Sequence, residues 1–192
     1  MLEKFFISEV RILMLKLMLL HPDTQYHVRF ISREIGAEIN AVRRELERLE
    51  DVGLLIKRRS SNRVYYRVNT NHVFYSDLLS MMAKETGLGK DILDNVKRLG
   101  DIRFAMLSKS FLRGRVSTVL DVDLFVVGRP DMSLLKVIVE RAQAERSGEI
   151  NYSVMTLEEF NHRKRSNDQF INRVLSQGRT MLIGDEEKFA SF

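Results

Sequence analysis

The sequence contains no cysteine, only two prolines, and no apolar run long enough to cross a bilayer. The absence of cysteine excludes disulfides, zinc sites built on Cys and a thiol nucleophile. The most apolar segment near the start, Ile12 to Leu20, is interrupted by Lys16 and followed by His21-Pro22, whereas a membrane-spanning helix needs about 20 apolar residues. It also lacks the small-residue cleavage pattern of a signal peptide. We therefore expect a core helix of a cytoplasmic protein, with no membrane contact.

Length and charge narrow the class of protein. A chain of 192 residues holds one large domain or two small ones. The net charge of +5 favours a nucleic-acid partner, although a solvated basic surface gives the same total. The distribution of charge is more informative, because the segment from Leu54 to Tyr66 has no acid and four bases: Lys57, Arg58, Arg59 and Arg63.

The first half of the chain predicts three helices and a hairpin. The helices are expected over Ser8 to Leu20, Val28 to Ile35 and about Ala41 to Val52, with Ser8 and Asn40 as N-caps and Gly36 closing the second helix. Val42, Leu46 and Leu49 form an inward apolar stripe on the third helix. The strands are expected over Leu55 to Arg59 and Val64 to Val68, joined by a turn at Ser60-Ser61-Asn62.

This order of elements resembles the winged helix-turn-helix of bacterial and archaeal transcriptional regulators. The resemblance covers Ile39 to Asn69 and rests on the core Leu46-x-x-Leu49-x-x-x-Gly53-Leu54-Leu55 and on the Tyr-Tyr-Arg-Val-Asn end of the hairpin. It implies that the third helix is a recognition helix and that the hairpin is a wing. Such regulators commonly bind double-stranded DNA as dimers. The apolar first helix is then either a homodimer interface or core.

A recognition helix enters the major groove with its N-terminal residues at the base edges. The candidates for base or phosphate contact are therefore Asn40, Arg43 and Arg44. Arg48 lies further along the helix and is a candidate for phosphate contact. The wing residues Arg58, Arg59 and Arg63 are candidates for contact with the DNA backbone or the minor groove. The alternative is that Arg43 and Arg48 pair with Glu47 and Glu45 on a solvated helix. DNA binding of this kind requires no cofactor.

Two carboxylates, Asp121 and Asp123, stand at the beginning of an apolar run that ends at Gly128. A strand is predicted over Leu120 to Val127, and residues i and i+2 of a strand point to the same face. Both carboxylates would then converge on one spot, as a divalent metal ion and a nucleotide phosphate require. The alternative is a structural pair satisfied by backbone N–H groups and solvent.

The rest of the chain predicts alternating helices and strands. A helix over Phe74 to Met82 is expected to break at Thr86 to Gly89, and Thr156 with Glu159 forms a capping box. The other predicted helices span Asp91 to Leu99, a short turn of helix within Ser108 to Gly114, Ser133 to Arg146, a helix from Leu157 and Phe170 to Leu175. The other predicted strands span Ile102 to Leu107, Ile150 to Met155 and Thr180 to Ile183.

The second half resembles the minimal nucleotidyltransferase domain of the polymerase-beta-like superfamily. Its pattern of Gly-Ser, Arg-Gly and Ser-Asp-x-Asp-Leu corresponds here to Lys109-Ser110, Arg113-Gly114 and Leu120-Asp121-Val122-Asp123-Leu124. The resemblance implies nucleotide binding at Lys109, Ser110, Arg113 and Gly114, and Mg²⁺ at Asp121 and Asp123. Lys109 replaces the Gly that lets phosphate approach, and Asn151 stands where a third carboxylate is expected. No residue is therefore assigned as catalytic.

The predicted fold class is α/β (α+β), with a winged helix-turn-helix over 1–71, a helical connector over 72–100 and a nucleotidyltransferase-like domain with a small mixed sheet over 101–192. The predicted function is that of a DNA-binding transcriptional regulator whose second domain is degenerate and binds a ligand or partner. Two alternatives stay open. One is an active Mg²⁺-dependent nucleotidyltransferase that modifies a protein or small molecule. The other is an antitoxin-like partner of a small helical toxin.

Overall fold

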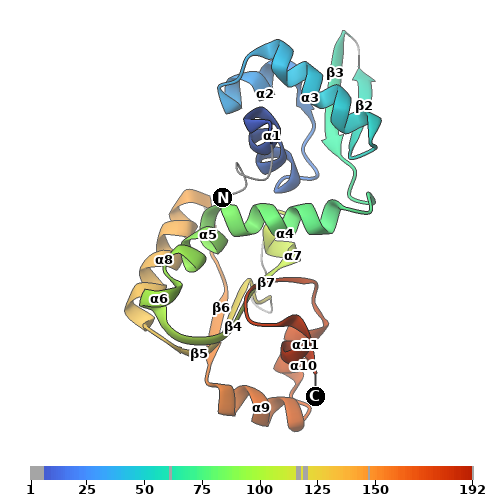
Figure 1. Ribbon diagram of the computed structural model, residues 1–192. Helices are drawn as coiled ribbons and strands as arrows, with labels where there is room; N and C mark the ends of the chain where they lie inside the picture. Colours follow the sequence, from blue (N-terminus) through green and yellow to red (C-terminus); the bar gives the residue numbers. More distant parts are fainter. Residues whose placement is uncertain (1–6, 61, 116–117, 119–120, 147, 192) are drawn as a thin grey trace. The chain divides into compact units, whose positions relative to one another are not determined.

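The computed structural model describes residues 7–60, 62–115, 118, 121–146 and 148–191. The protein is of mixed α/β class with two small sheets, which confirms the predicted fold class (Figure 1). The chain divides into two compact units, of which the first ends at Glu85 and the second begins at Thr86. The division therefore falls inside the residues predicted as a connector, 72–100. No helix within the described ranges is long and apolar enough to cross a membrane.

The first unit contains the three predicted helices and the predicted hairpin. Ser8 caps the first helix by accepting a hydrogen bond from Arg11 N at 3.2 Å, and Gly36 ends the second with a positive φ of 66°. A short strand that was not predicted pairs with the hairpin, so that the sheet order is β1-β3-β2, antiparallel throughout. The predicted turn residue Ser61 lies outside the described residues. The elements are α1 (Glu9–Leu19), β1 (Tyr26–His27), α2 (Val28–Ile35), α3 (Ile39–Asp51), β2 (Leu55–Ser60), β3 (Arg63–Val68) and α4 (Tyr75–Glu85).

The predicted N-cap of α3, Asn40, is wrong. Glu38 caps the helix instead, with its carboxylate accepting from Asn40 N at 2.8 Å and Ala41 N at 2.9 Å. Capping preferences favour Asn over Glu, but the longer Glu side chain reaches back to the same orphan N–H groups. The bond from the Asn40 N–H is the main cause that lowers the pKa of Glu38. The Asn40 side chain is consequently left on the exposed surface of α3.

The core of the first unit buries α1 against α3 and the sheet. Helix α1 contributes five buried side chains to this interior, so that it is core within its own unit: Ile12, Met14, Leu15, Met18 and Leu19. Among the described residues of this unit, one acid is buried: Glu45 of α3 is only 4% exposed. Its carboxylate accepts from Arg11 Nε at 2.7 Å and from an Arg48 guanidinium nitrogen at 2.9 Å. A buried carboxylate of this kind is stable because it is paired.

Replacing Glu45 by Gln should reduce the acid sensitivity of the protein. Burial alone would raise the pKa of Glu45, but hydrogen bonds from Arg11 and Ser8 and the Arg48 charge lower it below the ordinary 4.5. A carboxyl whose pKa is lowered by folding contributes stability above its unfolded pKa, and this contribution is lost as the pH falls through the folded pKa. Glu45→Gln should therefore be less stable than wild type near neutral pH and lose less stability on acidification. Urea unfolding at a series of pH values measures this, with the exposed Glu47→Gln as control. Equal pH dependence of Glu45→Gln and wild type would contradict the prediction.

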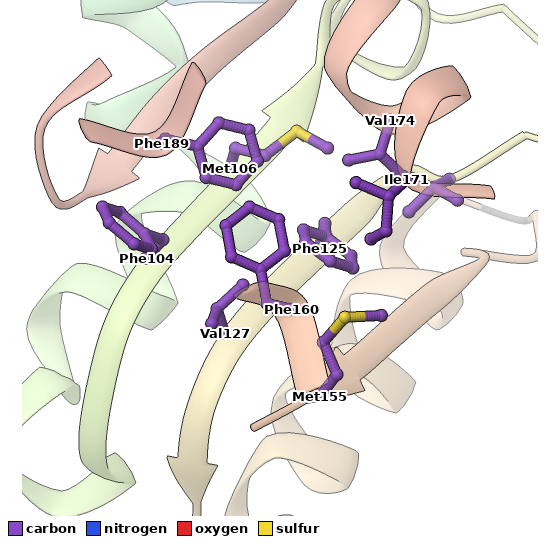
Figure 2. Close-up of a cluster of buried hydrophobic side chains, with 10 residues drawn as sticks. Phe104, Met106, Phe125, Val127, Met155, Phe160, Ile171, Val174 and Phe189 are labelled. Carbon is purple, nitrogen blue, oxygen red and sulfur yellow. The ribbon is translucent and has the colours of Figure 1, made fainter. Parts of the chain in front are cut away.

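The second unit is a mixed sheet with helices around it. The sheet order is β6-β5-β4-β7, with β5 and β6 parallel and the other pairs antiparallel. Figure 2 shows the aromatic core of this unit, in which Phe160 and Phe189 stack with ring centroids 5.3 Å apart. The elements are α5 (Gly87–Asp94), α6 (Val96–Leu99), β4 (Gly100–Ser108), α7 (Lys109–Leu112), β5 (Leu124–Pro130), α8 (Met132–Arg146), β6 (Tyr152–Met155), α9 (Leu157–Arg165), α10 (Gln169–Ser176), β7 (Arg179–Ile183) and α11 (Glu186–Ala190).

The predicted break after the helix over Phe74 to Met82 is confirmed at Thr86, because α4 ends at Glu85 and Thr86 is extended. Its predicted extent through Gly89 is wrong, because Gly87 opens α5 with a φ of 50°. The predicted helix Asp91 to Leu99 is divided between α5 and α6, because Asn95 ends the first of them. Helix α11 was not predicted.

The predicted strand over Leu120 to Val127 is also wrong at its beginning. Strand β5 starts only at Leu124, and Leu120 lies outside the described residues. Asp121 and Asp123 therefore precede the strand and do not share one of its faces. The reason is local: the side chains and backbone of residues 121–123 form hydrogen bonds with Thr118 and Asn151 instead of pairing with a neighbouring strand.

Candidate nucleic-acid interface

Helix α3 has one buried and one exposed face. Val42, Leu46 and Leu49 are buried. At about 100° per residue, Asn40, Arg43 and Arg44 lie on the opposite face, where all three are exposed. An Arg43 guanidinium nitrogen donates to Asn40 Oδ1 at 3.1 Å. The capping role of Glu38 and the inward stripe thus place the three predicted contact residues together on the first two turns of the exposed face.

The alternative of ion pairing within α3 holds for one arginine only. Arg48 pairs with Glu45, as that alternative expected. Arg43 bonds to Asn40 and forms no ion pair with Glu47 or any other acid that the structure describes. Arg44 likewise has no ion pair with an acid of the described ranges. The Glu38 carboxylate attracts both arginines electrostatically, but neither is held in an ion pair with a described acid, so both can meet an anionic partner.

The register of the hairpin divides the wing arginines between its two faces. Arg58 lies opposite Tyr65 and Arg59 opposite Val64, and side chains alternate between faces along a strand. Arg59 shares the face of Lys57, which bonds to Glu50 at 3.0 Å and whose pKa is raised mainly by that bond. The side chains on the opposite face of the hairpin, which follow from the same strand pairing, form what we call the outer face. It consists of Ile56, Arg58, Ser60, Arg63, Tyr65 and Arg67.

Arg67 is a basic residue of the wing that the sequence-based candidates missed. It lies on the outer face, directly opposite Ile56, and is exposed. The spacing Arg63-x-Tyr65-x-Arg67 gave a usable signal, because residues two apart on a strand point the same way. The predicted set Arg58, Arg59 and Arg63 is exposed throughout, but it is not one surface.

In the second unit, the two carboxylates lie in different environments. Asp121 is exposed, and its Oδ2 accepts from Thr118 N at 2.7 Å and Thr118 Oγ1 at 2.8 Å. These two bonds, the backbone one first, lower the pKa of Asp121. Asp123 is 1% exposed, and its Oδ2 accepts from Asn151 N at 2.9 Å. One carboxylate therefore closes a surface turn and the other lies in the interior.

Asn151 lies beside this segment, where a third carboxylate was expected, although it precedes β6. Its carbonyl accepts from Asp123 N at 2.8 Å and from Leu124 N at 3.2 Å. Its side-chain amide donates to Thr118 O at 2.7 Å. Asn151 thus ties together the segment that carries both carboxylates. The amide acts here as a donor to protein, a role that a carboxylate could not fill.

Arg146 is a further residue near Asp123 that the sequence analysis missed. Its guanidinium donates to Phe111 O at 2.8 Å and Arg115 O at 3.2 Å, and it lies 4.2 Å from the centroid of the Phe111 ring. Burial lowers the pKa of Arg146, and the charge of Asp123 opposes that shift. As the last residue of α8, Arg146 gave no distinctive local signal.

The predicted nucleotide-binding residues lie on and after α7. Ser108 caps this short helix, and Ser108 N donates to Asp123 O at 2.9 Å, which places α7 next to the carboxylate segment. Lys109 N donates to Gly178 O at 2.8 Å, and the aliphatic part of the Lys109 side chain lies beside Gly178, where it would make ordinary van der Waals contact with an added Cβ. Ser110 and Gly114 are exposed and Arg113 is half-buried.

An open depression of about 490 Å³ lies beside the carboxylate segment. Asp121, Asn151 and Arg173 supply its polar wall, and Tyr152 and Phe170 supply aromatic surface. Asp123 is not among the described residues that line it. Because the two carboxylates do not meet at one exposed point, this donor set does not fit a metal ion as it lies. We assign no chemical step to Mg²⁺ or a nucleotide here, and their binding stays a prediction.

Comparison with known proteins identified no relative of this chain. Scanning the chain against protein-family models gives no match, and searches of curated proteins and of solved structures give none.

Proposed function

We propose that the protein is a DNA-binding transcriptional regulator that docks α3 in the major groove of double-stranded DNA and places its β2-β3 hairpin against the flanking backbone. The observation that carries the proposal is the exposed group Asn40, Arg43 and Arg44 at the N-terminal end of α3, whose two arginines form no ion pair with a described acid. Residues at this end of a recognition helix reach the base edges. Arginine supplies the bidentate donor geometry that guanine and phosphate accept.

Two further observations support this proposal. The order of α1, β1, α2, α3 and an antiparallel hairpin is that of a helix-turn-helix followed by a wing. The hairpin adds exposed Arg58, Arg59 and Arg63 next to α3 in sequence. Cations distributed over a helix and a hairpin match the two phosphate backbones that border a groove. A homodimer bound to two half-sites agrees with this class and stays a prediction.

The wild-type chain should bind duplex DNA with an affinity that falls steeply as salt rises. Non-specific duplex DNA of about 20 base pairs suffices for this test, because phosphate contacts dominate such binding and release counterions. The measurement is a gel-shift or fluorescence-anisotropy titration, beginning at about 50 mM salt. Absence of binding at low salt would overturn the proposed function.

For the second unit, we propose a binding role without assigned chemistry. The depression at Asp121 offers a carboxylate, an arginine and two aromatic side chains, which suits a small polar ligand with a flat apolar part. Asp123 is buried and bonded within the protein, which favours the structural alternative for that carboxylate. Incubation with labelled nucleotide, Mg²⁺ and a cell lysate that supplies protein and small-molecule acceptors separates this role from an active nucleotidyltransferase, since only the enzyme transfers label to an acceptor in a manner that Asp121→Ala abolishes.

A further inference from the structure

The outer face of the hairpin carries aromatic and basic side chains without any acid. Arg58, Arg63 and Arg67 are exposed there, and none of them forms an ion pair with an acid that the structure describes. Tyr65 lies among them, directly opposite Arg58 in the ladder. The face therefore combines one aromatic ring with three cations, and its charge selects a polyanion.

Two more rings extend this face beyond the hairpin. His27 of β1 is the ladder partner of Tyr65, so both side chains point to the same side of the sheet. Their ring centroids are 6.0 Å apart at an interplanar angle of 75°. His27 also lies 6.3 Å from Phe30 at 80°, and the guanidinium of Arg33 is 5.7 Å from the Phe30 ring centroid. Tyr65, His27 and Phe30 thus form a row of three rings. Arg58 lies beside Tyr65 at one end of the row, and Arg33 lies beside Phe30 at the other.

The middle ring of this row is held in place before any ligand arrives. His27 Nδ1 accepts from Phe30 N at 3.1 Å, which caps α2 and fixes the orientation of the imidazole. Tyr65 is only partly exposed and packs against that ring. Rings that are ordered in the free protein lose little conformational entropy on binding. The surface is therefore a preformed one.

We propose that this outer face, with His27 and Phe30, binds unpaired nucleotides of a single-stranded nucleic acid. Bases present aromatic faces that stack on rings without regard to sequence, and the phosphates of the same strand meet the neighbouring arginines. A duplex conceals the faces of its bases, so the rings serve an unpaired strand in particular. This face shares Arg58 and Arg63 with the proposed duplex contact of the hairpin but includes no residue of α3, so single-strand binding is tested separately from duplex binding through Arg43 and Arg44.

The test uses the full chain and a fluorescein-labelled 15-mer of thymidine, with a 15-mer of uridine as second arm. Wild type should bind at least one of them in an anisotropy titration at low salt. Tyr65→Leu should weaken that binding by about fivefold to a hundredfold, because one stacking ring is lost, whereas Tyr65→Phe should bind nearly as wild type does. The duplex affinity of Tyr65→Leu should change far less. A preference between the two strands would show that the face distinguishes the 5-methyl group of thymine or the 2′-hydroxyl of RNA.

Two controls keep this inference falsifiable. Thermal unfolding shows whether Tyr65→Leu is folded, and Arg58→Ala plus Arg67→Ala, at exposed positions, tests the same face without changing a ring. Unchanged single-strand affinity in both variants, equal losses in Tyr65→Phe and Tyr65→Leu, or no binding by wild type would overturn the proposal. Arg43→Ala plus Arg44→Ala separates the two functions, since it should weaken duplex binding and spare the single strand. Single-strand binding without any duplex binding would remove the proposed function and retain this inference.

Discussion

Replacing Arg43 and Arg44 together by alanine should weaken duplex DNA binding by about tenfold to a hundredfold at roughly 50 mM salt. Both side chains lie on the exposed face of α3, and no ion pair with a described acid competes for them. Each guanidinium that meets a phosphate releases counterions, so losing two of them removes a large electrostatic contribution. On a specific operator, any contact to a base edge would add to the loss.

The matched control for this variant lies in the second unit. Lys97 and Arg98 are adjacent exposed cations of α6, and an Arg98 guanidinium nitrogen donates to Asn95 Oδ1 at 3.2 Å, as Arg43 donates to Asn40 at 3.1 Å. Lys97→Ala plus Arg98→Ala removes the same charge from a similar setting and should leave DNA affinity within about twofold of wild type. Equal losses in both double variants would mean that net charge, and not α3, determines the binding.

Asp123→Ala should destabilise the second unit by about 2–3 kcal/mol, whereas Asp121→Ala should cost roughly 0.5 kcal/mol. The Asp123 side chain is 1% exposed and is bonded by Asn151 N, so its removal leaves a donor without that acceptor. It also removes the charge that opposes the shift of the Arg146 pKa. Asp121 is exposed and its carboxylate accepts from Thr118 N and Thr118 Oγ1, a role in which solvent can replace it. Urea unfolding monitored by circular dichroism measures both.

A third variant separates the charge of Asp123 from its hydrogen bonding. Asp123→Asn retains an acceptor for the Asn151 N–H and should recover part of the stability lost in Asp123→Ala. Equal and small effects of Asp121→Ala and Asp123→Ala would contradict the structural role assigned to Asp123. They would return both carboxylates to consideration as a paired ligand site.

Helices with a clear apolar stripe and a clear stop could be predicted from the sequence. Helix α2 has the predicted bounds because Gly36 takes the positive φ that ends it. The inward stripe of α3 was predicted because Val42, Leu46 and Leu49 follow the helical period. Prediction was poorer where contacts between residues distant in sequence determine the structure. Strand β1 has only two residues and exists through its pairing with β3, and Glu45 is buried because Arg11 of α1 reaches it.

In the candidate sites, too, features set by local periodicity could be predicted and features set by distant contacts could not. Exposure of Asn40, Arg43 and Arg44 followed from helical geometry, whereas the N-cap of α3 did not, because a Glu side chain replaced the preferred Asn as the acceptor. The pairing of Asp121 and Asp123 failed because it assumed a strand. A bond from Thr118 to one carboxylate and a bond from Asn151 to the other fix the segment instead. The partner residue Asn151 is 28 positions from Asp123, and no local pattern announces such a bond.

The most direct measurement of the central claim is the slope of the logarithm of duplex affinity against the logarithm of salt concentration. Wild type and Arg43→Ala plus Arg44→Ala are compared in the same anisotropy titrations. If both arginines meet phosphates, the slope of the variant should be less steep by about 1.8, because each contact contributes about 0.9. An identical slope and an identical affinity in the two proteins would contradict the claim that α3 carries the DNA-binding surface.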